Sequence, residues 1–221
     1  MCEFDSSSEQ RLDDVINARR IYRSFRPESP PREEIMKIIG AGLAAPFAAA
    51  AVGKGGKEYF RQFFVFSAES RSLAIAGGLL MQKVHAMAED LEREMERNPA
   101  LKSRAATFKA RLEHIRKAGV VPGVETAPYF IVVAERRGFP EIEQQSLAYC
   151  LENMWLKATV LNLGFQLVSA TSGMGDDPEF CRLLGIPPGA YALNGCATGY
   201  YQETLPPSVR PPGEDVTTWM E

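Results

Sequence analysis

The sequence has few of the residues that build metal centres or disulfide frameworks. Its 221 residues include four cysteines and two histidines. The cysteines are scattered without Cys-x-x-Cys spacing, and no histidine pair lies near them to complete a zinc ligand set: Cys2, Cys150, Cys181 and Cys196. We therefore expect buried free thiols, no metal site and a reducing, cytoplasmic environment. The isolated His85 and His114 are expected to be exposed surface residues.

A positive net charge and a long apolar run are absent as well. Lys and Arg number 25 against 28 Asp and Glu, which gives a formal net charge of -3. Such a chain has no overall positive field to hold a nucleic-acid backbone or an anionic membrane. No uncharged apolar run is long enough to span a bilayer. We expect neither nucleic acid nor membrane as a partner.

The first ten residues are acidic and serine-rich and lack an apolar segment. They predict a disordered lead-in over residues 1–10, not a signal peptide. The remaining chain is rich enough in apolar residues, at 45% of the whole, to bury one core. We expect a single domain over residues 11–221.

Helical and strand patterns alternate along this domain, which predicts an α/β or α+β fold. Periodicity predicts helices over residues 11–19, 32–45, 144–163 and 178–184, and strands over 62–68, 129–134, 165–169 and 192–200. The apolar runs 62–68 and 129–134 predict strands covered on both faces. Residues 73–117 predict a charged helical excursion, broken at Asn98-Pro99. Helix 144–163 is expected to be central and to bury Trp155, with Gly164 as its stop signal.

Arginines at the two ends of the domain are the strongest functional signal. Arg19, Arg20 and Arg23 lie within five residues, and Arg210 lies in a proline-flanked tail. Arginine is always charged and matches phosphate or carboxylate oxygens bidentately, so the cluster predicts an anion site. Alternatively, Arg19 and Arg20 are cations at the C-terminal end of a helix, where the helix dipole favours positive charge.

The stretch 47–57 predicts a flexible connection close to a bound group, because an alanine run is followed there by three glycines. Its Gly-Lys-Gly-Gly-Lys sequence is not a P-loop.

Several motifs in order resemble the flavin (FMN)-dependent nitroreductase family. Asn17-Ala-Arg-Arg-Ile-Tyr-Arg-Ser-Phe25 is similar to the family's entry motif, Arg-Arg-Ser-x-Arg-x-Phe. The later matches are the Ala44-Ala-Pro46 helix end, the strand Ala127-Pro-Tyr-Phe-Ile-Val-Val133, the helix from Glu152 to Phe165, the Leu184-Gly-Ile-Pro-Pro188 turn and the tail Thr204-Leu-Pro206 with Arg210-Pro211. The resemblance covers nearly the whole chain from Arg11 onward.

The resemblance implies an α+β nitroreductase-like fold with a central, mostly antiparallel sheet flanked by helices. It also implies a homodimer with exchanged C-terminal tails and FMN at the subunit interface. The cofactor-binding positions that match the family are Arg19, Arg20, Ile21, Arg23 and Arg210 at the phosphate and ribityl end, Pro46, Phe47 and Ala48 in the flavin loop, and Ser172 and Gly173 at the flavin N5 edge.

The implied chemistry is a ping-pong oxidoreduction. NADH or NADPH gives a hydride to the flavin and leaves, and a nitro, quinone or similar acceptor then takes the electrons. The protein supplies orientation and electrostatics. No catalytic residue is therefore expected.

Two departures from the family pattern keep alternatives open. Ile21 stands where the family has serine, and Phe47-Ala48 follow Pro46 where it has Ser-Ser. Each lost buried contact costs about 1–3 kcal/mol, or about ten- to a hundredfold in affinity. Backbone amides are donors that could replace the missing side chains. One alternative is a degenerate member acting as a binding or regulatory module. Another is an enzyme that uses Cys150, Cys181 or Cys196 as nucleophile.

Overall fold

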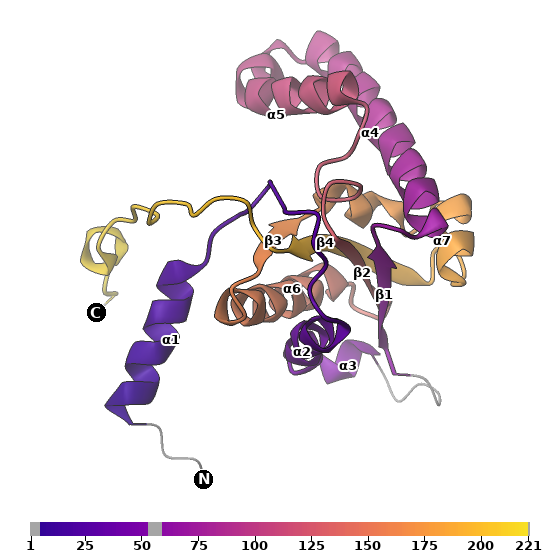
Figure 1. The fold of residues 1–221 in the computed structure, drawn as a ribbon. Coiled ribbons are helices and arrows are strands. Elements are labelled where there is room, and N and C mark those ends of the chain that lie inside the picture. The colour runs from indigo at the N-terminus through magenta and orange to yellow at the C-terminus, as the bar shows by residue number, and fades with distance from the viewer. Residues whose placement is uncertain (1–4, 53–58, 221) are drawn as a thin grey trace.

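Four antiparallel strands form the centre of the computed structural model, which describes residues 5–52 and 59–220. The strands are β1 (Arg61–Ser67), β2 (Tyr129–Arg136), β3 (Gly164–Leu167) and β4 (Tyr191–Gly199), in the sheet order β1-β2-β4-β3 (Figure 1). This arrangement confirms the α+β expectation and the antiparallel sheet.

Helices cover both faces of the sheet (Figure 1). On one face pack α2 (Arg32–Leu43) and α6 (Glu143–Val160), with the short α3 (Ala49–Val52) beside α2. On the other face lie α4 (Arg71–Arg97), α5 (Pro99–Ala118), the 3-10 helix η1 (Ser169–Met174) and α7 (Pro178–Leu184). The chain is completed by α1 (Ser6–Ala18) and by η2 (Gly213–Val216) in the tail.

The strand β2 joins the two cores because its successive side chains point to opposite faces. Phe130, Val132 and Ala134 belong to the core under α4. Tyr129, Ile131 and Val133 belong to the core under α6. The expected burial of this strand on both faces is confirmed. So is the core position of Trp155, which is 5% exposed.

The strand β1 corrects an expectation. Its apolar run predicted coverage on both faces, yet it is an edge strand and Val65 is 42% exposed. An apolar run cannot reveal how many strands and helices will neighbour it. The loop expected over 47–57 also contains the helical turn α3, and its residues 53–57, which include Lys54 and Lys57, lie outside the described part.

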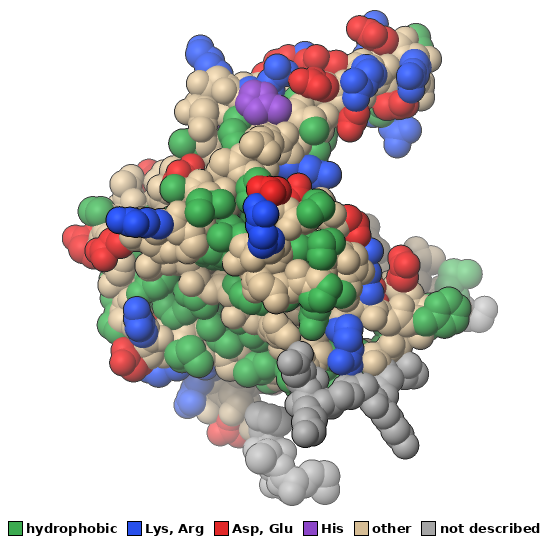
Figure 2. Space-filling model, turned by 90° about the vertical axis from the view of Figure 1, so that its right-hand side faces the viewer, with side chains coloured by type: hydrophobic (Ala, Val, Ile, Leu, Met, Phe, Trp, Pro, Cys, Tyr) green, Lys and Arg blue, Asp and Glu red, His purple; other side chains and the backbone are tan. Residues whose placement is uncertain are grey.

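The predicted excursion is present as a helical pair, which we call the α4–α5 arm. It breaks between Arg97 and Pro99 as expected. Its far part carries intermixed acidic and basic side chains (Figure 2). Several of these pair within or between the two helices, as in Arg93–Asp90, Arg97–Glu94, Lys109–Glu113 and Arg116–Glu92. Both His85 and His114 are exposed, as expected.

Several element boundaries differ from the sequence expectation by a few residues, and three of these differences follow from local structure. The first helix starts at Ser6, not at Arg11, because Asp5 caps it by accepting a hydrogen bond from the Ser8 backbone N–H at 2.9 Å. After α6 the left-handed residue is Asn162 (φ 56°), whereas Gly164 already belongs to β3. The strand β3 ends at Leu167, since the chain turns into η1 at Ser169.

Both ends of the chain leave apolar surface uncovered. The helix α1 has no buried residue, and Leu12 on its apolar face is 56% exposed. At the other end Trp219 is 85% exposed. The described helices include none that is both long and apolar enough to cross a membrane.

Candidate functional site

Residues 19–25, which we call the entry segment, dock on the outer edge of the sheet. Ile21 forms a parallel bridge with Phe165 of β3, and the Tyr22 backbone N–H donates to the Phe165 carbonyl at 3.1 Å. Farther on, Phe25 bridges Tyr201, just beyond β4. The arginine cluster therefore lies beside β3, the strand that leads into η1.

Arg19 is positioned by α6. Its Nε lies 3.1 Å from Glu152 Oε1, and its guanidinium lies 4.4 Å from the centroid of the Trp155 ring. The Trp155 indole N–H donates to the carbonyl of Arg20 at 3.0 Å. This side chain thus already has an acidic and an aromatic partner.

Arg20 fastens the tail to the entry segment. Its Nε donates to the carbonyl of Pro206 at 2.8 Å, and its Nη1 donates to the carbonyls of Asn17 and Arg19. Nearby, the rings of Tyr22 and Tyr201 stack with their centroids 4.2 Å apart. Burial, and next the neighbouring Tyr201, raise the pKa of Tyr22, so its hydroxyl stays neutral.

Arg23 and Arg210 are the two expected arginines with free guanidinium groups. Both are exposed, and among the described residues neither forms a hydrogen bond or an ion pair. Arg23 lines a small surface hollow together with Ile21 and Glu203. These two side chains can bind an anion without breaking an existing hydrogen bond or ion pair.

The residues Ser172 and Gly173 lie in η1, which begins two residues after β3 ends. The Ser172 hydroxyl donates to the Ser169 carbonyl at 2.8 Å. A Cβ added to Gly173 would lie 2.6 Å from Lys83 Cε, so glycine lets this lysine of α4 lie across the turn. Sequence reasoning missed Lys83, because a lysine within a charged helix gives no local signal of such a contact.

The residues Pro46, Phe47 and Ala48 lie between α2 and α3, on the α6 side of the sheet (Figure 1). The ring of Phe47 packs on Phe60 with 4.3 Å between centroids. Within the described residues no hydrogen bond, ion pair or ring contact joins Pro46, Phe47 or Ala48 to the entry segment. Direct contacts within the described residues therefore do not connect these three residues with the arginines of the entry segment.

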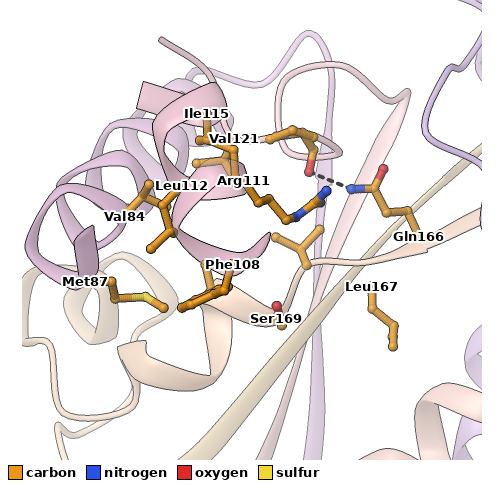
Figure 3. A pocket seen from close by; sticks show the side chains of 13 residues that line it. Val84, Met87, Phe108, Arg111, Leu112, Ile115, Val121, Gln166, Leu167 and Ser169 are labelled. Atoms are coloured by element: carbon orange, nitrogen blue, oxygen red, sulfur yellow. Dashed lines mark hydrogen bonds between the residues drawn. The ribbon is translucent and has the colours of Figure 1, made fainter. Parts of the chain in front are cut away.

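A hollow lies under the α4–α5 arm, between the arm and the β3–η1 connection (Figure 3). It is small, with a volume of about 60 Å³, and 13 residues line it. Most of the lining residues are apolar.

Arg111 reaches from α5 toward the amide of Gln166 (Figure 3). Gln166 is 3% exposed, and its Nε2 donates to the Pro122 carbonyl at 3.0 Å. Its Oε1 has no partner in the described structure.

The described cysteines are free and buried, as expected: Cys150, Cys181 and Cys196. Burial raises the pKa of Cys150 to about 11 and that of Cys196 well above its ordinary value. Burial, then Asp177 and Asp176, raise the pKa of Cys181. No group of three His, Cys, Asp or Glu in the described part is placed to hold a metal ion. This environment does not favour a nucleophilic thiol.

We expect Cys150, Cys181 and Cys196 to resist iodoacetamide in the native protein. With a pKa of about 11, only about one Cys150 thiol in a thousand is ionised near pH 8. A raised pKa also means that modification should keep increasing with pH above the usual thiol range. Mass spectrometry would measure the labelling, with protein unfolded in guanidinium as the control. Rapid native labelling of any of the three would contradict this account.

Several features of this region suit a phosphorylated planar ligand. Arg23 and Arg210 each offer a free guanidinium group to a phosphate, whose two negative charges need several donors when partly buried, but no contact in the described structure joins these two arginines. The exposed apolar side chains Ile21 and Leu167, 44% and 43% exposed, offer a surface beside the same strand edge. The Gly173 turn adds backbone that can approach a ligand closely.

Comparison with known proteins identifies the family. The model of the Nitroreductase family matches residues 16–200, most of the chain, and the protein therefore belongs to this family. Among curated proteins, none matches the sequence significantly.

Solved structures of the same fold cover nearly the whole chain. A nitroreductase with bound FMN from Bacteroides fragilis has 20% identity and a TM-score of 0.66, covering 95% of this chain and 98% of its own. A nitroreductase with bound FMN from Desulfitobacterium hafniense has 23% identity and a TM-score of 0.60, with coverages of 94% and 97%. An iodotyrosine deiodinase bound to FMN and 3-iodo-L-tyrosine has 17% identity and a TM-score of 0.63, with coverages of 90% and 95%. These likenesses show the nitroreductase fold.

Proposed function

We propose that the protein is an FMN-dependent oxidoreductase that passes electrons from NADH or NADPH to a nitro, quinone or similar acceptor. The observation that carries the proposal is the docking of the arginine-rich entry segment along β3, which continues directly into η1. Side chains that could bind an anion and an exposed backbone turn thus belong to one connected edge of the sheet. Membership of the nitroreductase family supports the same assignment.

The cofactor would be held at its phosphate end by Arg23 and Arg210, with Arg19 and Arg20 as further cations. Arg20 would act mainly by holding the tail in place, since its donors are engaged with carbonyls. Ser172 and Gly173 would present backbone groups at the ring edge. Bound FMN supplies two-electron transfer chemistry, so the protein needs to orient ligands and exclude water but needs no acid or nucleophile. A ping-pong order of donor and acceptor follows if both use the same open surface.

A homodimer would complete the site. A shallow groove of about 300 Å³ runs between α1, α2 and α6 and is lined by apolar groups that include Leu12, Val15 and Val160. The tail with its exposed Trp219 extends away from the body (Figure 1). A second subunit would cover these surfaces and could bring its own Pro46, Phe47 and Ala48 to the cofactor. We further propose a cytoplasmic location, in keeping with the free cysteines.

A second candidate is a degenerate member that binds or regulates without turnover. It is favoured by the engagement of Arg19 with Glu152 and by the apolar Phe47 and Ala48 in the flavin loop. Both features reduce the donors available to a cofactor.

An absorption spectrum taken before and after incubation with FMN and desalting decides between the candidates. We expect flavin bands that survive desalting, and flavin-dependent oxidation of NADH or NADPH with nitro compounds and quinones. A folded, colourless protein that retains no flavin would overturn the proposal and leave the second candidate. Sedimentation analysis of the same sample would test the dimer.

A further inference from the structure

We propose that Lys83 raises the affinity of the bound flavin for electrons by placing its ammonium group at the N5 edge of the ring. This inference rests on the proposed function, because it adds a residue to that cofactor site. There, Ser172 and Gly173 present backbone groups to the N5 edge. Lys83 comes from α4, a different element on the same face of the sheet.

The side chain of Lys83 lies against the η1 turn. A Cβ added to Gly173 would lie 2.6 Å from Lys83 Cε and 3.3 Å from its Nζ, and the three nearest atoms to that position all belong to Lys83. The lysine is half-buried, so its aliphatic stem packs on the turn while its charged end stays at the surface of the turn. A ring edge that approaches the Gly173 backbone therefore meets this ammonium group.

The charge of Lys83 has no counter-ion in the described structure. The side chain forms no hydrogen bond or ion pair with a described residue. The residues three and four positions away on the helix, where a carboxylate would pair with it, are all apolar: Leu79, Leu80, Ala86 and Met87. Farther along α4, by contrast, Arg93 pairs with Asp90. Lys83 is thus available to a negative charge that develops beside the turn.

Reduction of a flavin creates such a charge. A hydride adds to N5 with its two electrons, and the electron pair displaced within the ring leaves one negative charge there when no proton follows. The oxidised ring is neutral. A fixed ammonium beside the ring stabilises the reduced form over the oxidised form, and a half-buried position weakens the screening by water. We expect Lys83 to favour the negatively charged ring by about 10-fold.

Titration of the FMN-loaded protein with sulfite tests the proposal. The sulfur lone pair of sulfite forms a bond to N5, the displaced electron pair makes the ring negative as in reduction, and the visible flavin absorption is lost. We expect Lys83→Met to weaken sulfite binding by about 10-fold. Lys83→Arg keeps the charge and should bind sulfite like the wild type. Lys102→Met, on an exposed lysine of α5, is the matched control and should also do so.

Quenching of FMN fluorescence separates this charge effect from damage to the site. All four proteins should bind oxidised FMN with similar affinity, because its ring is neutral. The inference would be overturned by wild-type sulfite affinity in Lys83→Met, by an equal loss in Lys83→Arg, or by a loss of FMN affinity that parallels the sulfite effect. FMN-loaded wild type that forms no sulfite complex would overturn it too. Wild type that retains no flavin after desalting would overturn the proposed function itself, and with it this inference, before any sulfite is added.

Discussion

Replacing Glu135 by alanine is expected to lower the free energy of unfolding by about 3–5 kcal/mol. Glu135 Oε2 lies 3.0 Å from Arg61 Nη2 and accepts from Arg61 Nε at 3.1 Å. Both residues are 2% exposed. The remaining donors of Arg61 go to the Gly42 carbonyl at 2.8 Å and the Ser146 hydroxyl at 2.9 Å. Removing the carboxylate would leave a buried guanidinium without its counter-charge. Urea unfolding followed by circular dichroism would measure the loss.

Two controls separate this effect from the general cost of substitution. Glu179→Ala breaks the exposed pair with Arg182 and should cost no more than about 1 kcal/mol. The double variant Arg61→Met/Glu135→Leu replaces both charges and should be more stable than Glu135→Ala, because no unpaired charge remains. A single variant as stable as the wild type would contradict the role of this pair in joining β1, β2, α2 and α6.

Replacing Arg23 and Arg210 together by methionine is expected to weaken FMN binding by about 100-fold or more. Each free guanidinium can make charge-assisted hydrogen bonds to a phosphate, at about 10- to 100-fold in affinity each. Neither side chain has another partner in the described structure, so the folded state should be unaffected. Quenching of flavin fluorescence during titration would give the dissociation constants.

A matched control for this pair is Arg11→Met on the exposed face of α1, which should bind FMN like the wild type. Unfolding temperatures of all three proteins would verify that they fold equally well. Wild-type affinity in the Arg23→Met/Arg210→Met variant would remove these two arginines from the proposed phosphate site.

The candidate site could be located in part from the sequence. The arginines stand out because they cluster within a few residues, and the structure indeed places the entry segment along β3. Which of these arginines form ion pairs or hydrogen bonds could not be predicted from their spacing in the sequence. Arg19 pairs with Glu152, and Arg20 donates to the carbonyl of Pro206, which lies 186 residues away in the chain.

The same limit explains the features that sequence reasoning missed. Arg61 precedes the apolar run that predicted β1, so nothing local marked it as the centre of a buried network. Lys83 lies against Gly173, and Arg111 lines the same hollow as Gln166. Both contacts arise only because the α4–α5 arm packs over η1. Such contacts join residues from different elements, and periodicity within one element carries no information about them.

By itself the sequence determined the order and type of the main elements, the break at Asn98-Pro99, and the burial of Trp155 and of the second strand. These features follow from local periodicity, capping residues and proline, which act over a few residues. Only the tertiary structure decided that β1 lies at an edge and that Arg19 is paired. It also decided that, among the described residues, Arg23 and Arg210 have no partner and Arg111 lines a hollow without a counter-ion. Those outcomes depend on which distant residues the packed sheet and arm bring together, because burial and charge pairing are properties of the whole fold.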